Sequence, residues 1–271
     1  MASGAVAAHY ETRALKTAIL DAIEAAGLDC TQITPDDLAP LEEFHTLGRP
    51  ATIELAELAG VTRASQVLDV GAGLAGPARL LAARYGVHVT ALDLTAAYCE
   101  AARMLNQLTG LSDLVQVRQG DALDLPFADA SFDLVWTQHA SMNIADKSRL
   151  YSEISRVLTP DGRFAMFDIV AGEVSPIHFP VPWAGDPSIS FLESIDQMHS
   201  LLLAAGFTTL VWDDLTARVL AFFEGRAVSA RGAPTAIGLH LLAPDMPDKL
   251  ANQARNVRER RVRFLRAVLT R

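Results

Sequence analysis

Val-Leu-Asp-Val-Gly-Ala-Gly-Leu-Ala-Gly, residues 67–76, is an apolar run that ends in a glycine-rich turn. Such a run predicts a buried β-strand followed by a tight turn and a helix. Glycines at positions 71 and 73 let the backbone approach a ligand closely, because no Cβ intrudes. The spacing G-x-G-x-x-G also occurs in dinucleotide sites and has low specificity alone. A carboxylate at Asp69, two residues before the first glycine, suits a ligand with positive charge better than a pyrophosphate.

A second acid, Asp93, follows the β-like run 87–92 and lies 22 residues beyond Gly71. In nucleotide-binding α/β folds, a carboxylate at the end of the second strand accepts hydrogen bonds from the ribose hydroxyls. The two features occur together at the expected separation, so we interpret them as one nucleoside site. The alternative is an ordinary strand–helix turn, with Asp93 as an acid before a helix that starts near Thr95.

Further motifs follow along the chain: Gly120-Asp121-Ala122, Leu125-Pro126-Phe127, Ser131-Phe132-Asp133 and Leu158-Thr159-Pro160-Asp161-Gly162. Together with the Asp69 loop and Asp93, they resemble the class I S-adenosylmethionine (SAM)-dependent methyltransferases over residues 61–172. In the last motif, Asp161 replaces the first glycine of the family's Leu-x-Pro-Gly-Gly turn, and Asp tolerates turn conformations. The resemblance implies SAM as methyl donor and S-adenosyl-L-homocysteine as product.

The alternation of elements predicts an α/β fold with a doubly wound, seven-stranded, mostly parallel sheet of the Rossmann-like methyltransferase type. Strands are expected at 66–70, 87–92, 115–118, 132–136, 163–169, 207–212 and 262–268. Helices are expected at 76–85, 95–109, 147–158 and 194–205. By resemblance, the last strand inserts antiparallel to the others.

Two segments flank this predicted sheet. Residues 1–60 are expected to form an N-terminal helical cap, with helices over 9–27, from Thr34, and over 50–58, and residues 61–271 form the SAM-binding domain. Prolines interrupt residues 171–193, which forbids regular helix there. We interpret 171–205 as a substrate lid; the alternative is an ordinary surface loop.

The acids and glycines supply the predicted SAM contacts. Asp69 would attract the ammonium group, Asp93 would hold the ribose diol, and Asp121, by resemblance, would accept a hydrogen bond from the adenine amino group. The remaining predicted contacts are Gly71, Ala72 and Gly73 beside the methionine part, Leu94, Ala122 and Leu123 around adenine, and Gln138 at the methionine end.

The N-terminal segment adds Tyr10 and Arg49, the latter as partner of the SAM carboxylate. Their alternatives are a core-edge aromatic ring and a surface salt bridge. His139 is the predicted catalytic base, because an imidazole pKa suits proton transfer near neutrality. A structural histidine bonded to a backbone carbonyl is the alternative, and His45 is the second candidate.

The amino-acid composition excludes several classes of binding partner. A net charge of -9 and a pI near 5.2 argue against nucleic-acid binding. Cys30 and Cys99 suggest free thiols in a reducing compartment, hence a cytoplasmic protein, and the scattered histidines predict no metal. No stretch reaches the ~18 apolar residues of a spanning helix, so no membrane partner is expected. The lid and cap favour a small-molecule methyl acceptor; the oligomeric state stays open.

Two branches of the family are similar to residues 136–146. Met142-Asn143-Ile144 resembles the Arg-Asn-Val-like segment of ubiquinone/menaquinone C-methyltransferases but lacks the Arg. Glycine/sarcosine-type N-methyltransferases resemble the N-terminal segment and the start of this stretch. Two alternative functions remain: an NAD-dependent oxidoreductase with the same glycine spacing, and a catalytically silent SAM-binding module.

Overall fold

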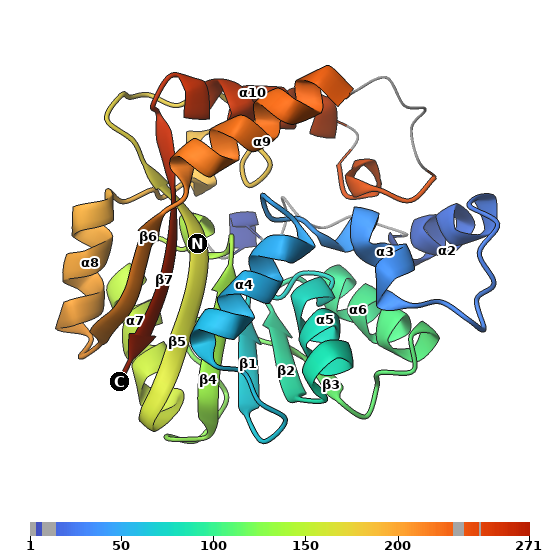
Figure 1. The fold of residues 1–271 in the computed structure, drawn as a ribbon, viewed down its shortest axis with the longest axis horizontal. Coiled ribbons are helices and arrows are strands. Elements are labelled where there is room, and N and C mark those ends of the chain that lie inside the picture. The colour runs from blue at the N-terminus through green and yellow to red at the C-terminus, as the bar shows by residue number, and fades with distance from the viewer. Residues whose placement is uncertain (1–3, 7–14, 230–235, 244) are drawn as a thin grey trace.

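The computed structural model describes residues 4–6, 15–229, 236–243 and 245–271. Its strands are β1 Gln66–Val70, β2 His88–Asp93, β3 Val115–Gln119, β4 Phe132–Gln138, β5 Leu158–Ala171, β6 Thr208–Asp214 and β7 Val262–Thr270. They form one sheet in the order β3-β2-β1-β4-β5-β7-β6 (Figure 1). β7 runs antiparallel to β5 and β6, and the other neighbouring pairs are parallel. The predicted fold class and the antiparallel last strand are confirmed.

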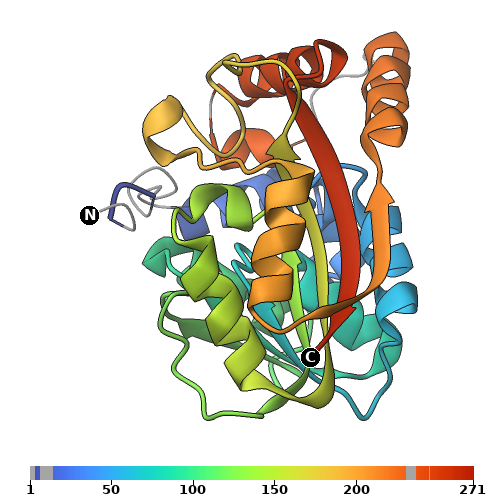
Figure 2. The same ribbon diagram turned by 90° about the vertical axis from the view of Figure 1, so that its left-hand side faces the viewer.

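Helices cover both faces of this sheet, as Figure 2 shows edge on. They are α2 Leu15–Ala25, α3 Pro35–Glu42, α4 Arg49–Ala59, α5 Gly76–Tyr85, α6 Ala96–Leu108, α7 Lys147–Val157, α8 Ile195–Ala204, α9 Thr216–Ser229 and α10 Met246–Arg258. Successive residues of β1 point to opposite faces. Val67 packs in the core shared with α4 and α5, and Leu68 packs in the core shared with α7 and α8.

Helix α4 packs on the first of these faces, whereas α2 and α3 pack against α6 and α5. Thr34 caps α3, because its hydroxyl accepts from the Asp37 amide while the Asp37 carboxylate accepts from the Thr34 amide. A buried ion pair then joins α3 to α5: the Arg79 Nε lies 3.0 Å from Glu42 Oε1, and both side chains are fully buried. Of the helix expected over 9–27, the part over 9–14 lies outside the described residues.

The turn before β5 differs from its expected form. The structure has one strand over 158–171 where a turn followed by a strand at 163–169 is expected, and the pairing with β4 shifts between Phe132 and Leu134. Asp161 has a φ of 64°, in the left-handed region that Asp tolerates better than most residues. The extra residues are accommodated as an irregularity within the ladder, so the sheet continues through them.

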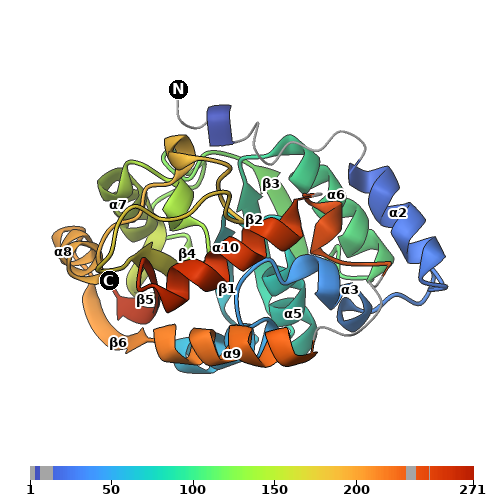
Figure 3. The same cartoon turned by 90° about the horizontal axis from the view of Figure 1, so that it is seen from above.

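The region between β6 and β7 contains α9 and α10, which the sequence does not predict. The two helices lie above the carboxyl ends of the central strands (Figures 1 and 3). Of the proposed lid, residues 172–193 are mostly irregular, and Trp183 within them is buried. Helix α8 packs on α7 through Met198 and Leu202 and so belongs to the covered sheet face. The lid role stays a prediction.

None of the helices among the described residues has the length and apolar character needed to cross a bilayer.

Candidate functional site

A cavity of about 1350 Å³ lies at the carboxyl ends of β1, β2 and β4. Ligands of open α/β sheets bind at this edge, where the strand order reverses. The walls come from three sources: the loops after the strands, the segment between α3 and α4, and the α9–α10 region. The volume exceeds the ~300–1,000 Å³ typical of a pocket for one small ligand, so two molecules can bind side by side.

The glycine turn after β1 forms the floor of this cavity. Gly71 has a φ of 75°, and a Cβ there would lie 2.6 Å from the Ala140 Cβ, so only glycine fits. The Gly73 amide donates to Asp93 Oδ2 at 2.8 Å. The Thr95 amide donates to Asp93 Oδ1 at 2.8 Å. Asp93 therefore holds the turn and also lines the cavity.

Asp69 is a buried acid with an unused oxygen. Its side chain is almost wholly buried, and its Oδ2 has no hydrogen-bond partner among the described residues. Burial, with a smaller contribution from the Asp93 charge, raises the pKa of the Asp69 carboxyl to about 8. A cationic ligand group beside it would restore the ionised form, because it replaces the hydration that burial removes.

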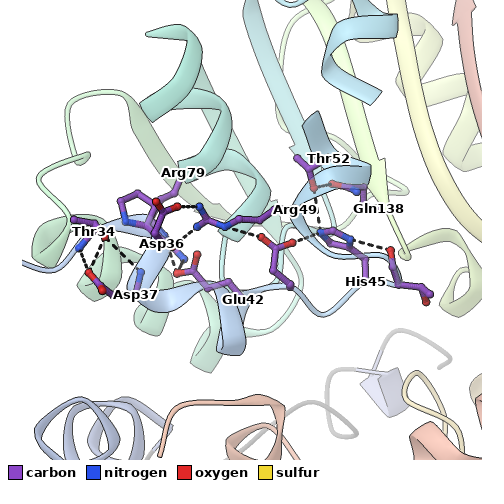
Figure 4. A network of polar contacts seen from close by, with 12 residues as sticks. Thr34, Asp36, Asp37, Glu42, His45, Arg49, Thr52, Arg79 and Gln138 are labelled. Carbon is purple, nitrogen blue, oxygen red and sulfur yellow. Dashed lines mark hydrogen bonds and ion pairs between the residues drawn. The ribbon is translucent and has the colours of Figure 1, made fainter. Parts of the chain in front are cut away.

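Gln138, at the end of the neighbouring strand β4, has a side-chain amide nitrogen without a hydrogen-bond partner among the described residues. Its Oε1 accepts from Thr52 Oγ1 at 3.1 Å and from Trp136 Nε1 at 3.0 Å, which fixes the orientation of the amide (Figure 4). The Nε2 is buried without a partner among the described residues. A buried donor left unpaired is unfavourable by about 1–3 kcal/mol, so this group is suited to a ligand acceptor atom.

His139 follows Gln138 and has a φ of 51°, an uncommon value for histidine. Its amide donates to the Phe167 carbonyl, and its ring lies 5.0 Å from the Phe167 ring and 5.8 Å from the Phe264 ring. The Nε2 atom is buried and has no partner among the described residues. Burial, and then the charge of His45, lowers the pKa of His139 well below its usual value, so the ring is neutral at pH 7.

His45 lies across the cavity from His139, with 6.2 Å between ring centroids. Its Nε2 is 2.8 Å from Glu43 Oε2 and 3.2 Å from Thr52 Oγ1. His45 is therefore held in place by the N-terminal cap, whereas His139 keeps one ring nitrogen for a ligand. This difference favours His139 over His45 as the ring that contacts an acceptor. Its lowered pKa makes it a weaker base than the ordinary imidazole that the sequence prediction assumes.

Arg49 is not brought into the cavity. Its guanidinium pairs with Asp36, and its Nε lies 3.1 Å from Glu43 Oε1 (Figure 4). It is absent from the described residues that line the cavity. This arrangement is the salt-bridge alternative, and it corrects the expectation that Arg49 is free to meet a carboxylate. Tyr10 lies outside the described residues.

The other predicted contacts line the same cavity: Ala72, Leu94, Asp121, Ala122 and Leu123. Asp121 Oδ1 accepts from the Leu123 amide at 2.9 Å, which fixes the turn after β3. The structure thus brings the expected site residues together, apart from Arg49 and Tyr10. Among the described residues no group of three metal-ligating side chains occurs; the absence of a metal stays a prediction.

Sequence reasoning missed the opposite wall. It consists of Phe222 and Phe223 on α9 together with Leu242, Met246 and Leu250, which we call the apolar wall. The signal was present in α10: Met246, Leu250 and Val257 recur at the spacing of one helix face. No motif identifies these residues, because only the fold brings this segment over the strand ends.

Comparison with known proteins agrees with this geometry. A family model described as a methyltransferase domain matches residues 68–166. The glycine/sarcosine/dimethylglycine N-methyltransferase of Actinopolyspora halophila is 30% identical over 194 residues, 69% of this chain and 34% of that protein. Methyltransferase GfsG of Streptomyces halstedii is 34% identical over 186 residues, 67% of this chain and 66% of that protein. The chain therefore spans about a third to two thirds of these relatives.

Among solved structures, the geranyl diphosphate C-methyltransferase of Streptomyces coelicolor A3(2) aligns with a TM-score of 0.70. The alignment covers 100% of this chain and 98% of that one at 19% identity, which shows a shared fold. The predicted resemblance to SAM-dependent methyltransferases is confirmed by these comparisons.

Proposed function

Because the chain contains a SAM-dependent methyltransferase domain, we propose that it transfers the methyl group of SAM to a small molecule by in-line displacement, with S-adenosyl-L-homocysteine as product. One observation carries the proposal: Asp69 Oδ2 and Gln138 Nε2 are both buried and unpartnered at the cavity lined by the glycine turn. An acceptor and a donor are thus reserved for one ligand, and the methionine end of SAM carries an ammonium and a carboxylate.

The other residues of the floor fit the rest of SAM. Asp93 lines the cavity at the end of β2, where a carboxylate can accept hydrogen bonds from ribose hydroxyls. Asp121, Leu94 and Leu123 line the adenine side, as the resemblance implies. Burial raises the pKa of Asp69 and of Asp93, and a cationic ligand group beside them would favour their ionised forms.

Bound SAM supplies a methyl group made electrophilic by the sulfonium. The residues of the chain position the acceptor, exclude water from the site and provide a group that accepts a proton. The enclosed cavity aligns the acceptor atom with the methyl carbon, and positioning accounts for a large share of such rate enhancements. Where the acceptor atom carries a proton, the neutral Nε2 of His139 accepts it as the new bond to the methyl carbon forms and the carbon–sulfur pair stays on sulfur.

The small-molecule acceptor is supported by the enclosed walls. The α9–α10 region lies above the strand ends, and Pro182 and Trp183 also line the cavity, which favours a small acceptor over a polymer. Cys30 and Cys99 are both free thiols, which suits a reducing compartment, and we propose the cytoplasm.

The experiment is calorimetric titration with S-adenosylhomocysteine and with NADH, followed by incubation with methyl-labelled SAM and a metabolite extract. We expect micromolar S-adenosylhomocysteine binding, no NADH binding, and label in a small molecule. Tight binding of NADH alone would favour the oxidoreductase alternative. Binding of S-adenosylhomocysteine with no labelled product from any extract would favour the catalytically silent module.

A further inference from the structure

The cavity has two chemically different sides. The floor carries Asp69, Asp93 and Asp121, whereas the apolar wall consists of two phenylalanines, two leucines and a methionine. The two sides come from distant parts of the chain, and α10 crosses above the strand ends (Figure 3). If the floor holds SAM, as the proposed function requires, the apolar wall faces the acceptor.

Charge is distributed unevenly around the whole cavity. Its described lining includes six acidic residues, namely Glu42, Glu43, Asp69, Asp93, Asp121 and Asp146, and among those described residues no lysine or arginine. Arg79 of α5 pairs with Glu42, and Arg49 pairs with Asp36 and Glu43, so neither guanidinium is available to an anionic acceptor. His139 adds no positive charge, because its ring is neutral.

An anionic acceptor would be poorly stabilised in these surroundings. A carboxylate or phosphate that leaves water needs a cation or several donors, and without them it loses several kcal/mol. An apolar molecule gains about 25 cal/mol for each Å² of its surface that the wall covers. The free energy of binding therefore favours an uncharged acceptor over an anionic one.

We propose that the acceptor is an uncharged, mainly apolar small molecule. Its apolar body lies against Phe222, Phe223, Leu242, Met246 and Leu250, and one polar group with a proton donates to His139 Nε2. This inference rests on the proposed function. It separates this chain from the substrates that two of its relatives carry in their names, since geranyl diphosphate and sarcosine both bear anionic groups.

The test uses a matched pair of fluorescent probes with the full chain saturated with S-adenosylhomocysteine. N-phenyl-1-naphthylamine is uncharged, and 1-anilinonaphthalene-8-sulfonate has the same rings with one sulfonate. We expect the uncharged probe to bind at least ten-fold more tightly. Equal or tighter binding of the sulfonate, or no binding of either probe, would overturn the proposal.

A charge variant makes the test specific to the wall. Leu250→Lys places a cation at the apolar wall, whereas the control Leu203→Lys changes a half-exposed residue of α8 far from it. We expect the first variant to shift the ratio of the two affinities at least ten-fold toward the sulfonate, and the second to leave it unchanged. An unchanged ratio in Leu250→Lys would place the probes elsewhere and overturn the proposal.

S-adenosylhomocysteine binding is measured by calorimetry in every variant. This measurement tests the proposed function separately from the proposed class of acceptor. If it fails in the wild-type chain, the proposed function is wrong. If it succeeds while the sulfonate probe is preferred, only the acceptor class is wrong.

Discussion

The floor and the apolar wall of the cavity differ in how their residues are encoded. Asp69, Gly71 and Asp93 lie within one βαβ stretch: Asp69 is the penultimate residue of β1, Gly71 follows β1, and Asp93 ends β2. The apolar wall comes from α9, α10 and Leu242 between them, more than a hundred residues later, and carries no motif. The residues that hold the cofactor can therefore be recognised from their spacing in the sequence. The residues that face the acceptor are brought together only by the fold. The predictions below test this division.

The largest expected loss of ligand affinity comes from a substitution in the floor of the cavity. Gly71→Val should abolish S-adenosylhomocysteine binding, with a loss of roughly a hundred-fold or more, because the side chain would overlap Ala140 and a φ of 75° is strained for valine. Calorimetry measures the loss. Gly185→Val is the control, since its Cβ would meet nothing within 4 Å. Retained binding in the Gly71 variant would separate the glycine turn from the ligand.

His139→Ala should lower turnover by about 10²–10⁴-fold while S-adenosylhomocysteine affinity changes little, because the residue lies between the two sides and acts on the acceptor proton. Steady-state kinetics with the identified acceptor and calorimetry give the two quantities. His88→Ala, at an exposed position of β2, serves as the control. Unchanged turnover would remove His139 from the chemistry.

Asp93→Ala should weaken S-adenosylhomocysteine binding by about 1–3 kcal/mol, since ribose hydroxyls lose their acceptor. The variant also frees the Gly73 and Thr95 amides, so thermal unfolding is followed in parallel. Asp93→Asn keeps the shape and part of the accepting capacity and should lie between wild type and Ala. Wild-type affinity in both variants contradicts the ribose assignment.

Asp69 should make binding and stability depend on pH in opposite directions. The pKa of the folded carboxyl is raised from 3.8 to about 8, so its contribution to stability is full below pH 3.8 and is lost as the pH rises toward 8. A cationic ligand needs the ionised form, so affinity for S-adenosylhomocysteine should rise with pH and level off above 8. Asp69→Asn should bind more weakly, have a higher Tm than wild type at pH 8, and show a flatter pH profile. A wild-type profile in Asp69→Asn contradicts the assignment.

The smallest effect is expected for Arg49→Ala. Because the guanidinium is engaged by Asp36 and Glu43, S-adenosylhomocysteine affinity should change less than two-fold and stability by about 0–1 kcal/mol. Calorimetry and thermal unfolding measure both. A loss of ten-fold or more in affinity would restore the predicted role of Arg49 toward the SAM carboxylate.

Much of the central fold is predictable because its signals are local. Alternating apolar runs and turns identify β1 to β4, and Thr34-Pro35 identifies the start of α3. The helices α9 and α10 between β6 and β7 were missed because they have ordinary helical composition and carry no motif. Arg49 was misjudged for a related reason: its competing partners, Asp36 and Glu43, are visible only when the loop between α3 and α4 is folded.

The buried pair between Glu42 and Arg79 has a mechanical consequence. It fastens the end of α3 to α5 beside the glycine turn, and separating one partner of such a pair costs about 3–5 kcal/mol. A Cβ at Gly76 would lie 2.5 Å from the Glu42 Cβ, so the two elements are also in close contact there. We therefore expect this side of the cavity to keep its position as ligands enter and leave. On the other side, α10 is held by hydrogen bonds such as that from Gln253 Nε2 to Thr46 Oγ1 at 3.2 Å.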